Sequence, residues 1–212
     1  MGFSVERTTR PDEGKHLSFS QVRHNLALTR FLVAAHRWAG ESEAFKLSEV
    51  RICYDLAASV GKVGSGERGR DKAPVIPDGW LLFERAGREP TPSRYPVLLE
   101  IDRGTAYRVK FKRQVSARVE YIKSGEYSRT FGEKAVMIAY ATTGETAEYR
   151  EARLRSMRSW TMEVLKELGA EKWAGVFRFS SLSLEGMYEA GIFSEPLWYR
   201  PDMEKPVRLL GD

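Results

Sequence analysis

Two apolar stretches constrain the fold of this sequence more than any other feature. VLLEID begins at Val97 and is apolar up to its acids, and KAVMIAYAT ends at Thr142. A short, continuous apolar run is typical of a strand that is covered on both faces. Such strands need helices on both sides of their sheet, so the sequence predicts a layered α/β fold.

The other patterns along the chain predict a mixed sheet. Helical spacing of apolar residues alternates with strand-like runs, and Gly169 closes the last long helix. Three consecutive strands, followed by alternating helices and strands, imply a sheet that is flanked by helices. The predicted order is therefore helix, three strands, helix, strand, helix, strand. In chain order these elements span 20–39, 50–57, 75–85, 95–102, 106–123, 134–142, 145–169 and 173–182.

A chain of 212 residues has the length of one domain with a core of its own. Residues 1–18 are polar and contain Pro11 and Gly14, so we expect a flexible N-terminal lead before a single α/β domain over 19–212. The sequence has neither a signal peptide nor an apolar run of about 18 residues, so we expect a cytoplasmic protein with no membrane partner. The single cysteine, Cys53, fits a reducing compartment.

Three carboxylates are predicted to meet at the end of the apolar strand. Glu100 and Asp102 end that strand one residue apart, and Asp78 begins the strand before it. A hairpin that pairs Glu84 with Tyr95 places Asp78 beside both acids. Crowded carboxylates repel one another unless a cation lies among them, so Mg²⁺ is the expected cofactor, held by all three. Such an ion can activate water for phosphodiester hydrolysis.

The acids also have a simpler explanation. Each can be neutralised by an arginine, and Arg51, Arg103 and Arg108 are the candidates. Asp78 can also serve as a turn former, because it follows Pro77. A metal ion and arginine side chains are therefore alternative partners for the cluster.

The densest basic segment of the chain follows the acids directly. From Arg103 to Arg129 there are eight Lys or Arg residues against two acids, which favours contacts with DNA phosphates over a merely solvated helix. The glycine and threonine of DRGT also predict a helix start whose free amides face an anion. The residues expected to contact DNA are Arg103, Thr105, Arg108, Arg113 and Lys123. The arginines of the next helix are interleaved with acids and are predicted to form a solvated face: Arg150, Arg153, Arg155 and Arg158.

Four motifs together resemble the replication-relaxation family of plasmid and mobile-element proteins. They are IPDGWLLF, LLEIDRGT, VEYIKSGEY and RTFG, and the resemblance covers about residues 20–180. It implies DNA as a partner and a role beside plasmid replication or mobilisation proteins. It also implies an upstream winged helix-turn-helix, and this chain begins about where such a domain would end.

The same layout is similar to the PD-(D/E)XK nuclease superfamily, which implies a restriction-endonuclease-like core. Pro77 and Asp78 match the first motif and Glu100 matches the second acid. Asp102 stands where that superfamily has its lysine. The resemblance then implies that the basic group comes from the following helix. The candidates for that group are Lys110, Lys112 and Arg118.

These observations lead to three hypotheses about function. The first is a Mg²⁺-dependent DNA endonuclease that nicks its substrate, with the three carboxylates and a basic residue of the next helix as catalytic groups. The second is a catalytically inactive DNA-binding or assembly module on the same fold, because the lysine is missing. The third is an interaction scaffold without a nucleic-acid role.

Overall fold

The computed structural model of this chain describes residues 18–52, 56, 76–85, 87, 93–104 and 106–210. The predicted order of helices and strands is confirmed, with one short helix, α4, added between the second predicted helix and the fourth strand. None of the helices in these residues combines the length and the apolar character needed to cross a bilayer. The elements are α1 (Phe19–Glu41), β1 (Phe45–Ile52), β2 (Gly79–Arg85), β3 (Ser93–Asp102), α3 (Arg108–Lys123), α4 (Glu126–Phe131), β4 (Met137–Thr142), α5 (Ala147–Glu167), the 3₁₀ helix η1 (Glu171–Val176), β5 (Phe177–Ser181), η2 (Gly186–Tyr188) and η3 (Ala190–Phe193).

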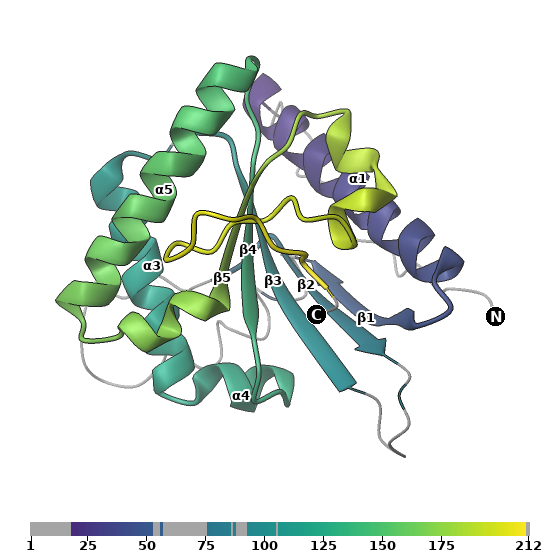
Figure 1. The fold of residues 1–212 in the computed structure, drawn as a ribbon, viewed down its shortest axis with the longest axis horizontal. Coiled ribbons are helices and arrows are strands. Elements are labelled where there is room, and N and C mark those ends of the chain that lie inside the picture. Colours follow the sequence, from purple (N-terminus) through teal and green to yellow (C-terminus); the bar gives the residue numbers. More distant parts are fainter. Residues whose placement is uncertain are drawn as a thin grey trace, which may run out of the picture.

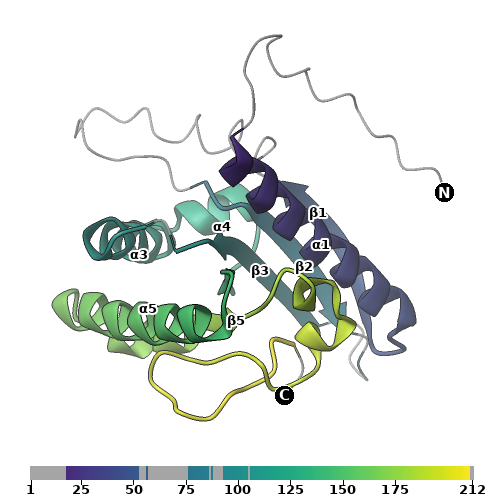
Figure 2. The same ribbon diagram turned by 90° about the horizontal axis from the view of Figure 1, so that it is seen from above.

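The five strands form one mixed sheet in the order β1-β2-β3-β4-β5 (Figure 1). β2 is antiparallel to β1 and to β3, whereas β3, β4 and β5 are parallel to one another. Helices cover both faces, so the prediction of an α/β fold with a mixed, helix-flanked sheet is confirmed. α1 lies on one face, and α3 and α5 lie on the other (Figure 2).

The central strands are apolar throughout because they face two cores. Leu81 and Phe83 of β2 pack in the core under α1, whereas Trp80 and Leu82 pack in the core under α3 and α5. The same alternation runs along β3 and β4, so neither strand has a polar face in its middle.

Local chemistry sets the start of α1. The side chain of Ser18 accepts the backbone N–H of Gln21, and the Gln21 side chain accepts the N–H of Ser18, which completes a capping box. Ser18, which was predicted to end a flexible lead, is thus the N-cap of the helix. Residues 1–17 of that lead lie outside the described residues.

All five predicted strands begin two to five residues away from the expected position: β2 starts at Gly79, β3 at Ser93 and β4 at Met137. β1 starts five residues earlier, at Phe45. The last part of its predicted range, 53–55 and 57, lies outside the described residues and includes Cys53. β5 starts at Phe177 because η1 takes the residues before it.

The predicted hairpin register was wrong by one residue. Glu84 pairs with Arg94, and Tyr95 pairs with Phe83. The observed register places both rings on the α1 face, where Phe83 is in the core and Tyr95 packs against it; the predicted one would have put a glutamate there. Continued by one residue, this register brings Asp78 level with Glu100.

Candidate functional site

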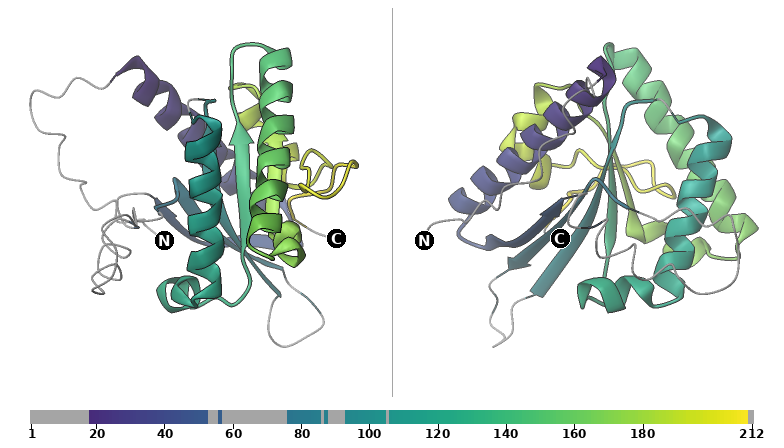
Figure 3. Two further views of the ribbon diagram at one scale, coloured as in Figure 1. Left: turned by 90° about the vertical axis from the view of Figure 1, so that its left-hand side faces the viewer. Right: turned by 180° about the vertical axis from the view of Figure 1, so that it is seen from behind.

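The three predicted acids line one cavity at the carboxyl ends of β3 and β4. The cavity has a volume of about 300 Å³ and is called the acid cavity below. The helix residues that line it come from the first turns of α1 and of α3. These two helices lie on opposite faces of the sheet (Figure 3). Open α/β sheets commonly bind their ligands at this edge. The described residues that line it are Ser20, Gln21, His24, Asn25, Asp78, Glu100, Ile101, Asp102, Arg103, Ala106, Lys110, Phe111, Gln114 and Tyr140.

Asp78 is held by the neighbouring strand and by α1. Its Oδ2 accepts the backbone N–H of Ile101 at 2.7 Å, and its own N–H donates to the Leu99 carbonyl at 3.1 Å. His24 Nε2 lies 3.1 Å from the other oxygen, Oδ1. The hydrogen bond with Asp78 raises the pKa of His24, although burial works against it. The pairing of His24 with Asp78 could not be predicted from the sequence, because nothing in a helical pattern shows which strand end a helix will cross.

Glu100 is paired with Arg118 of α3 in a buried contact. An Nη2 proton of Arg118 is donated to Glu100 Oε1, and the two side chains are 5% and 13% exposed respectively. Burial raises the pKa of Glu100 to about 7, and the positive charge of Arg118 acts in the opposite direction. Arg118 was a candidate to replace the missing lysine of the nuclease motif, but its guanidinium is engaged as the counter-ion of Glu100.

Asp102 is paired with Arg153 of α5 by two hydrogen bonds. Arg153 Nε and Nη2 each donate to one carboxylate oxygen at 2.9 Å, and the Gly104 N–H adds a bond of 3.1 Å. The side chains are 8% and 9% exposed. Arg153 was predicted to belong to a solvated helix face, and this prediction was wrong because the start of α5 packs against the end of β3.

Arginines are thus partners of the acids, but they are not the arginines that the sequence suggested. Arg51 pairs with Glu49, and Arg108 pairs with Glu163. Arg103 donates to the carbonyl and the hydroxyl of Ser20.

The donor set, as it is arranged, does not fit Mg²⁺. Both oxygens of Asp78 and both oxygens of Asp102 already accept hydrogen bonds, and Glu100 uses Oε1. Glu100 Oε2 is the carboxylate oxygen that no described residue contacts. In the part of the chain that the structure describes, no group of three or more His, Cys, Asp or Glu residues is placed to hold a metal ion. Mg²⁺ in proteins is usually held by one or two carboxylates together with water, and here an ion would have to displace the buried arginines from Glu100 and Asp102.

Of the predicted lysine substitutes, Lys110 lines the acid cavity. It is exposed and forms no ion pair with another described residue. Lys112 instead binds Glu163 at 3.4 Å and Glu167 at 2.5 Å, which ties α3 to α5.

The residues predicted to contact DNA are dispersed. Arg103 lines the acid cavity, whereas Arg113 and Lys123 are exposed along α3 and Arg108 is exposed but paired with Glu163. Thr105 lies outside the described residues.

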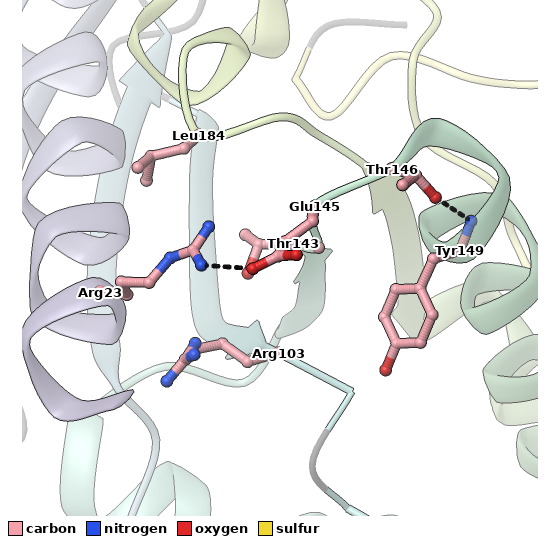
Figure 4. A pocket seen from close by; sticks show the side chains of 8 residues that line it. Arg23, Arg103, Thr143, Glu145, Thr146, Tyr149 and Leu184 are labelled. Carbon is pink, nitrogen blue, oxygen red and sulfur yellow. Dashed lines mark hydrogen bonds and ion pairs between the residues drawn. The ribbon is translucent and has the colours of Figure 1, made fainter. Parts of the chain in front are cut away.

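A second cavity, of about 460 Å³, adjoins the first at Arg103 and opens at the start of α5 (Figure 4). Arg23 reaches into it from α1 and pairs with Glu145 at 2.9 Å. The Tyr149 ring packs against the chain after β3 and after β4: a Cβ at Gly104 would lie 1.8 Å from its hydroxyl, and one at Gly144 would lie 2.5 Å from its Cδ1.

One buried polar group of the acid cavity has no partner. Tyr140 pairs with Glu100 across β3 and β4, is 3% exposed, and its hydroxyl has no hydrogen-bond partner among the described residues. Burial raises its pKa above the ordinary value. That Tyr140 lines the cavity could not be predicted from the sequence, because the residue lies in an apolar run.

Comparisons with protein-family models, with curated proteins and with solved structures found no match. The described residues themselves define an α/β protein with a five-stranded mixed sheet and a charged cavity at the carboxyl ends of its parallel strands.

Proposed function

We propose that this chain is a nucleic-acid-binding module on a restriction-endonuclease-like core, and that it does not cleave its ligand. One observation carries the proposal: each acid of the cluster has its own basic partner, Asp78 with His24, Glu100 with Arg118 and Asp102 with Arg153. Two of these pairs are buried. The arrangement favours the inactive alternative among the hypotheses from sequence.

The nuclease-like part of the proposal rests on the placement of the motifs. Asp78, of the PD motif, directly precedes β2, and Glu100, the second acid, lies near the end of the adjacent strand β3; both line one cavity. The order of the helices and strands also agrees with the order expected for this core. These similarities concern the scaffold, and a scaffold alone does not imply activity.

The binding part rests on charge at the rim of the cavity. Arg103 and Lys110 line it, and Arg23 lies in the cavity next to it. The acids beneath are neutralised by their own partners, so a polyanion meets these cations without facing three free carboxylates. On the resemblance of the four sequence motifs, the setting that we propose is plasmid replication or mobilisation.

Metal-dependent nicking of DNA is the second candidate. The observation that favours it is that Lys110 shares one cavity with the three acids, as a relocated catalytic lysine would. This function requires Arg118 and Arg153 to release buried carboxylates, and breaking such pairs costs about 3–5 kcal/mol each.

Binding is tested by fluorescence anisotropy with labelled DNA over a series of salt concentrations. Arg103→Ala with Lys110→Ala should weaken binding and lower the slope of log K against log salt by about 1.5, since each phosphate contact contributes about 0.7–0.9. The matched control is Lys134→Ala with Lys172→Ala. These exposed lysines precede β4 and β5, so they lie at the amino ends of the parallel strands, away from the acid cavity. Equal effects of the two double variants, or no binding by wild type, would contradict the proposal.

Cleavage is tested on supercoiled plasmid in Mg²⁺ and in Mn²⁺. We expect wild type to leave the plasmid intact. Nicking that disappears in the Asp78→Ala, Glu100→Ala double variant would establish the second candidate instead.

A further inference from the structure

The Tyr140 hydroxyl is a buried hydrogen-bonding group that the protein leaves unused. It is 3% exposed, lines the acid cavity and has no partner among the described residues. Buried hydroxyls are almost always satisfied by protein, water or ligand, and an unsatisfied one costs about 1–3 kcal/mol. A group of this kind at a cavity wall indicates that something polar occupies the cavity.

The groups around this hydroxyl offer both donors and acceptors. Glu100 Oε2 has no hydrogen-bond partner among the described residues, and Asn25 of α1 and Gln114 of α3 line the same cavity. A volume of about 300 Å³ lies at the lower end of the range of roughly 300–1,000 Å³ that is typical of small-molecule sites. The cavity therefore suits a small, flat, polar group with donors and acceptors at its edge.

Two aromatic rings stand in solvent next to residues of the cavity wall. Phe19 is 75% exposed and precedes Ser20, and Tyr107 is 85% exposed and follows Ala106. Large aromatic side chains are usually buried in a protein core or in an interface. Exposed rings beside cationic side chains, here Arg103 and Lys110 of the cavity, are an arrangement by which proteins bind single-stranded nucleic acid, because every base has a face that can stack.

We propose that the acid cavity takes one unpaired base of a single-stranded nucleic acid. The inference rests on the proposed function and names the ligand of that site. The Tyr140 hydroxyl and Glu100 Oε2 hydrogen-bond the polar edge of the base. Neighbouring bases stack on Phe19 and Tyr107, and the phosphates between them lie along Arg103 and Lys110. A duplex does not fit, because its bases are paired and stacked and do not reach a cavity of this kind.

The experiment compares a labelled single-stranded oligonucleotide with a duplex of the same sequence by fluorescence anisotropy at one salt concentration. Wild type should bind the single strand more tightly. Tyr140→Phe should weaken single-strand binding about 2- to 10-fold, the effect of one hydrogen bond, and should leave duplex binding unchanged. The same variant should not lower the melting temperature, because it removes an unsatisfied hydroxyl; this result separates the loss of a contact from a loss of folding.

The stacking positions are tested by Phe19→Ala and Tyr107→Ala, each of which should weaken single-strand binding at least about fivefold. The matched control is Tyr188→Ala, because this exposed tyrosine follows β5 and packs against Arg37 of α1 outside both cavities. An oligonucleotide of abasic sites, which keeps the phosphates, should bind more weakly than one with bases. DNA and RNA versions of one sequence then show which sugar is preferred.

The outcomes separate the two proposals. Salt-dependent binding with equal affinity for single strand, duplex and abasic strand would overturn the base site and leave the nucleic-acid-binding function intact. No binding of any of these ligands would overturn both.

Discussion

Arg153→Met removes the partner of a buried carboxylate, and the structure sets the size of the effect. Asp102 is 9% exposed and keeps one donor, the Gly104 N–H, when the two bonds to Arg153 are lost. A buried charge left without its partner costs about 3–5 kcal/mol. We therefore predict a loss of about 4 kcal/mol at pH 7.

The assay is urea unfolding of wild type and variant at pH 7. The control is Arg129→Met, whose partner is Glu126 in an exposed pair, and it should cost less than about 1 kcal/mol. A loss for Arg153→Met no larger than that of the control would refute the account of this pair.

Three further predictions concern the pH dependence, the turn after β3 and the start of α1. Burial raises the pKa of Glu100 from 4.5 to about 7, so the folded state holds this proton more tightly than the unfolded chain does. The free energy of unfolding should therefore fall by up to about 3 kcal/mol as the pH rises through this window. Urea unfolding at a series of pH values measures this fall, and Glu100→Gln should lack it. Gly104→Ala should cost more than about 1–2 kcal/mol in thermal unfolding, because its φ is +73° and the new Cβ would meet the Tyr149 hydroxyl. The control Gly40→Ala should be neutral or stabilising, because its new Cβ would have nothing within 4 Å. Equal effects of the two substitutions would contradict this explanation. Ser18→Ala removes half of a capping box and should cost about 1 kcal/mol in the same measurement, and no change would mean that the cap contributes nothing to the start of α1.

The sequence predicted the elements well where a local pattern had a single structural explanation. The apolar runs at Val97 and before Thr142 needed cover on both faces, and the two cores provide it. The hairpin register could not be predicted in this way. Because β2 and β3 are apolar on both faces, their sequences alone do not show which residues pair. The pairing of Phe83 with Tyr95 on the α1 face decides the register, and that face is not visible before the fold is known.

For the site, too, neighbours in sequence were predictable and partners distant in sequence were not. That acids would gather could be predicted, because Glu100 and Asp102 share a strand and Asp78 belongs to the adjacent one. Their partners could not, since Arg118 and Arg153 come from helices 18 and 51 residues further along the chain. Arginines close in sequence were the natural candidates, but the crossover helices bring distant ones to the strand end.

The question of what neutralises the acid cluster can be answered by one titration. Calorimetry of wild type with millimolar Mg²⁺, and then with Mn²⁺, measures directly whether the carboxylates are available to a metal ion. We predict no heat of binding, because Arg118, Arg153 and His24 already occupy the cluster. Stoichiometric binding that is lost in the Asp78→Ala, Glu100→Ala double variant would contradict the account and make this a metal site.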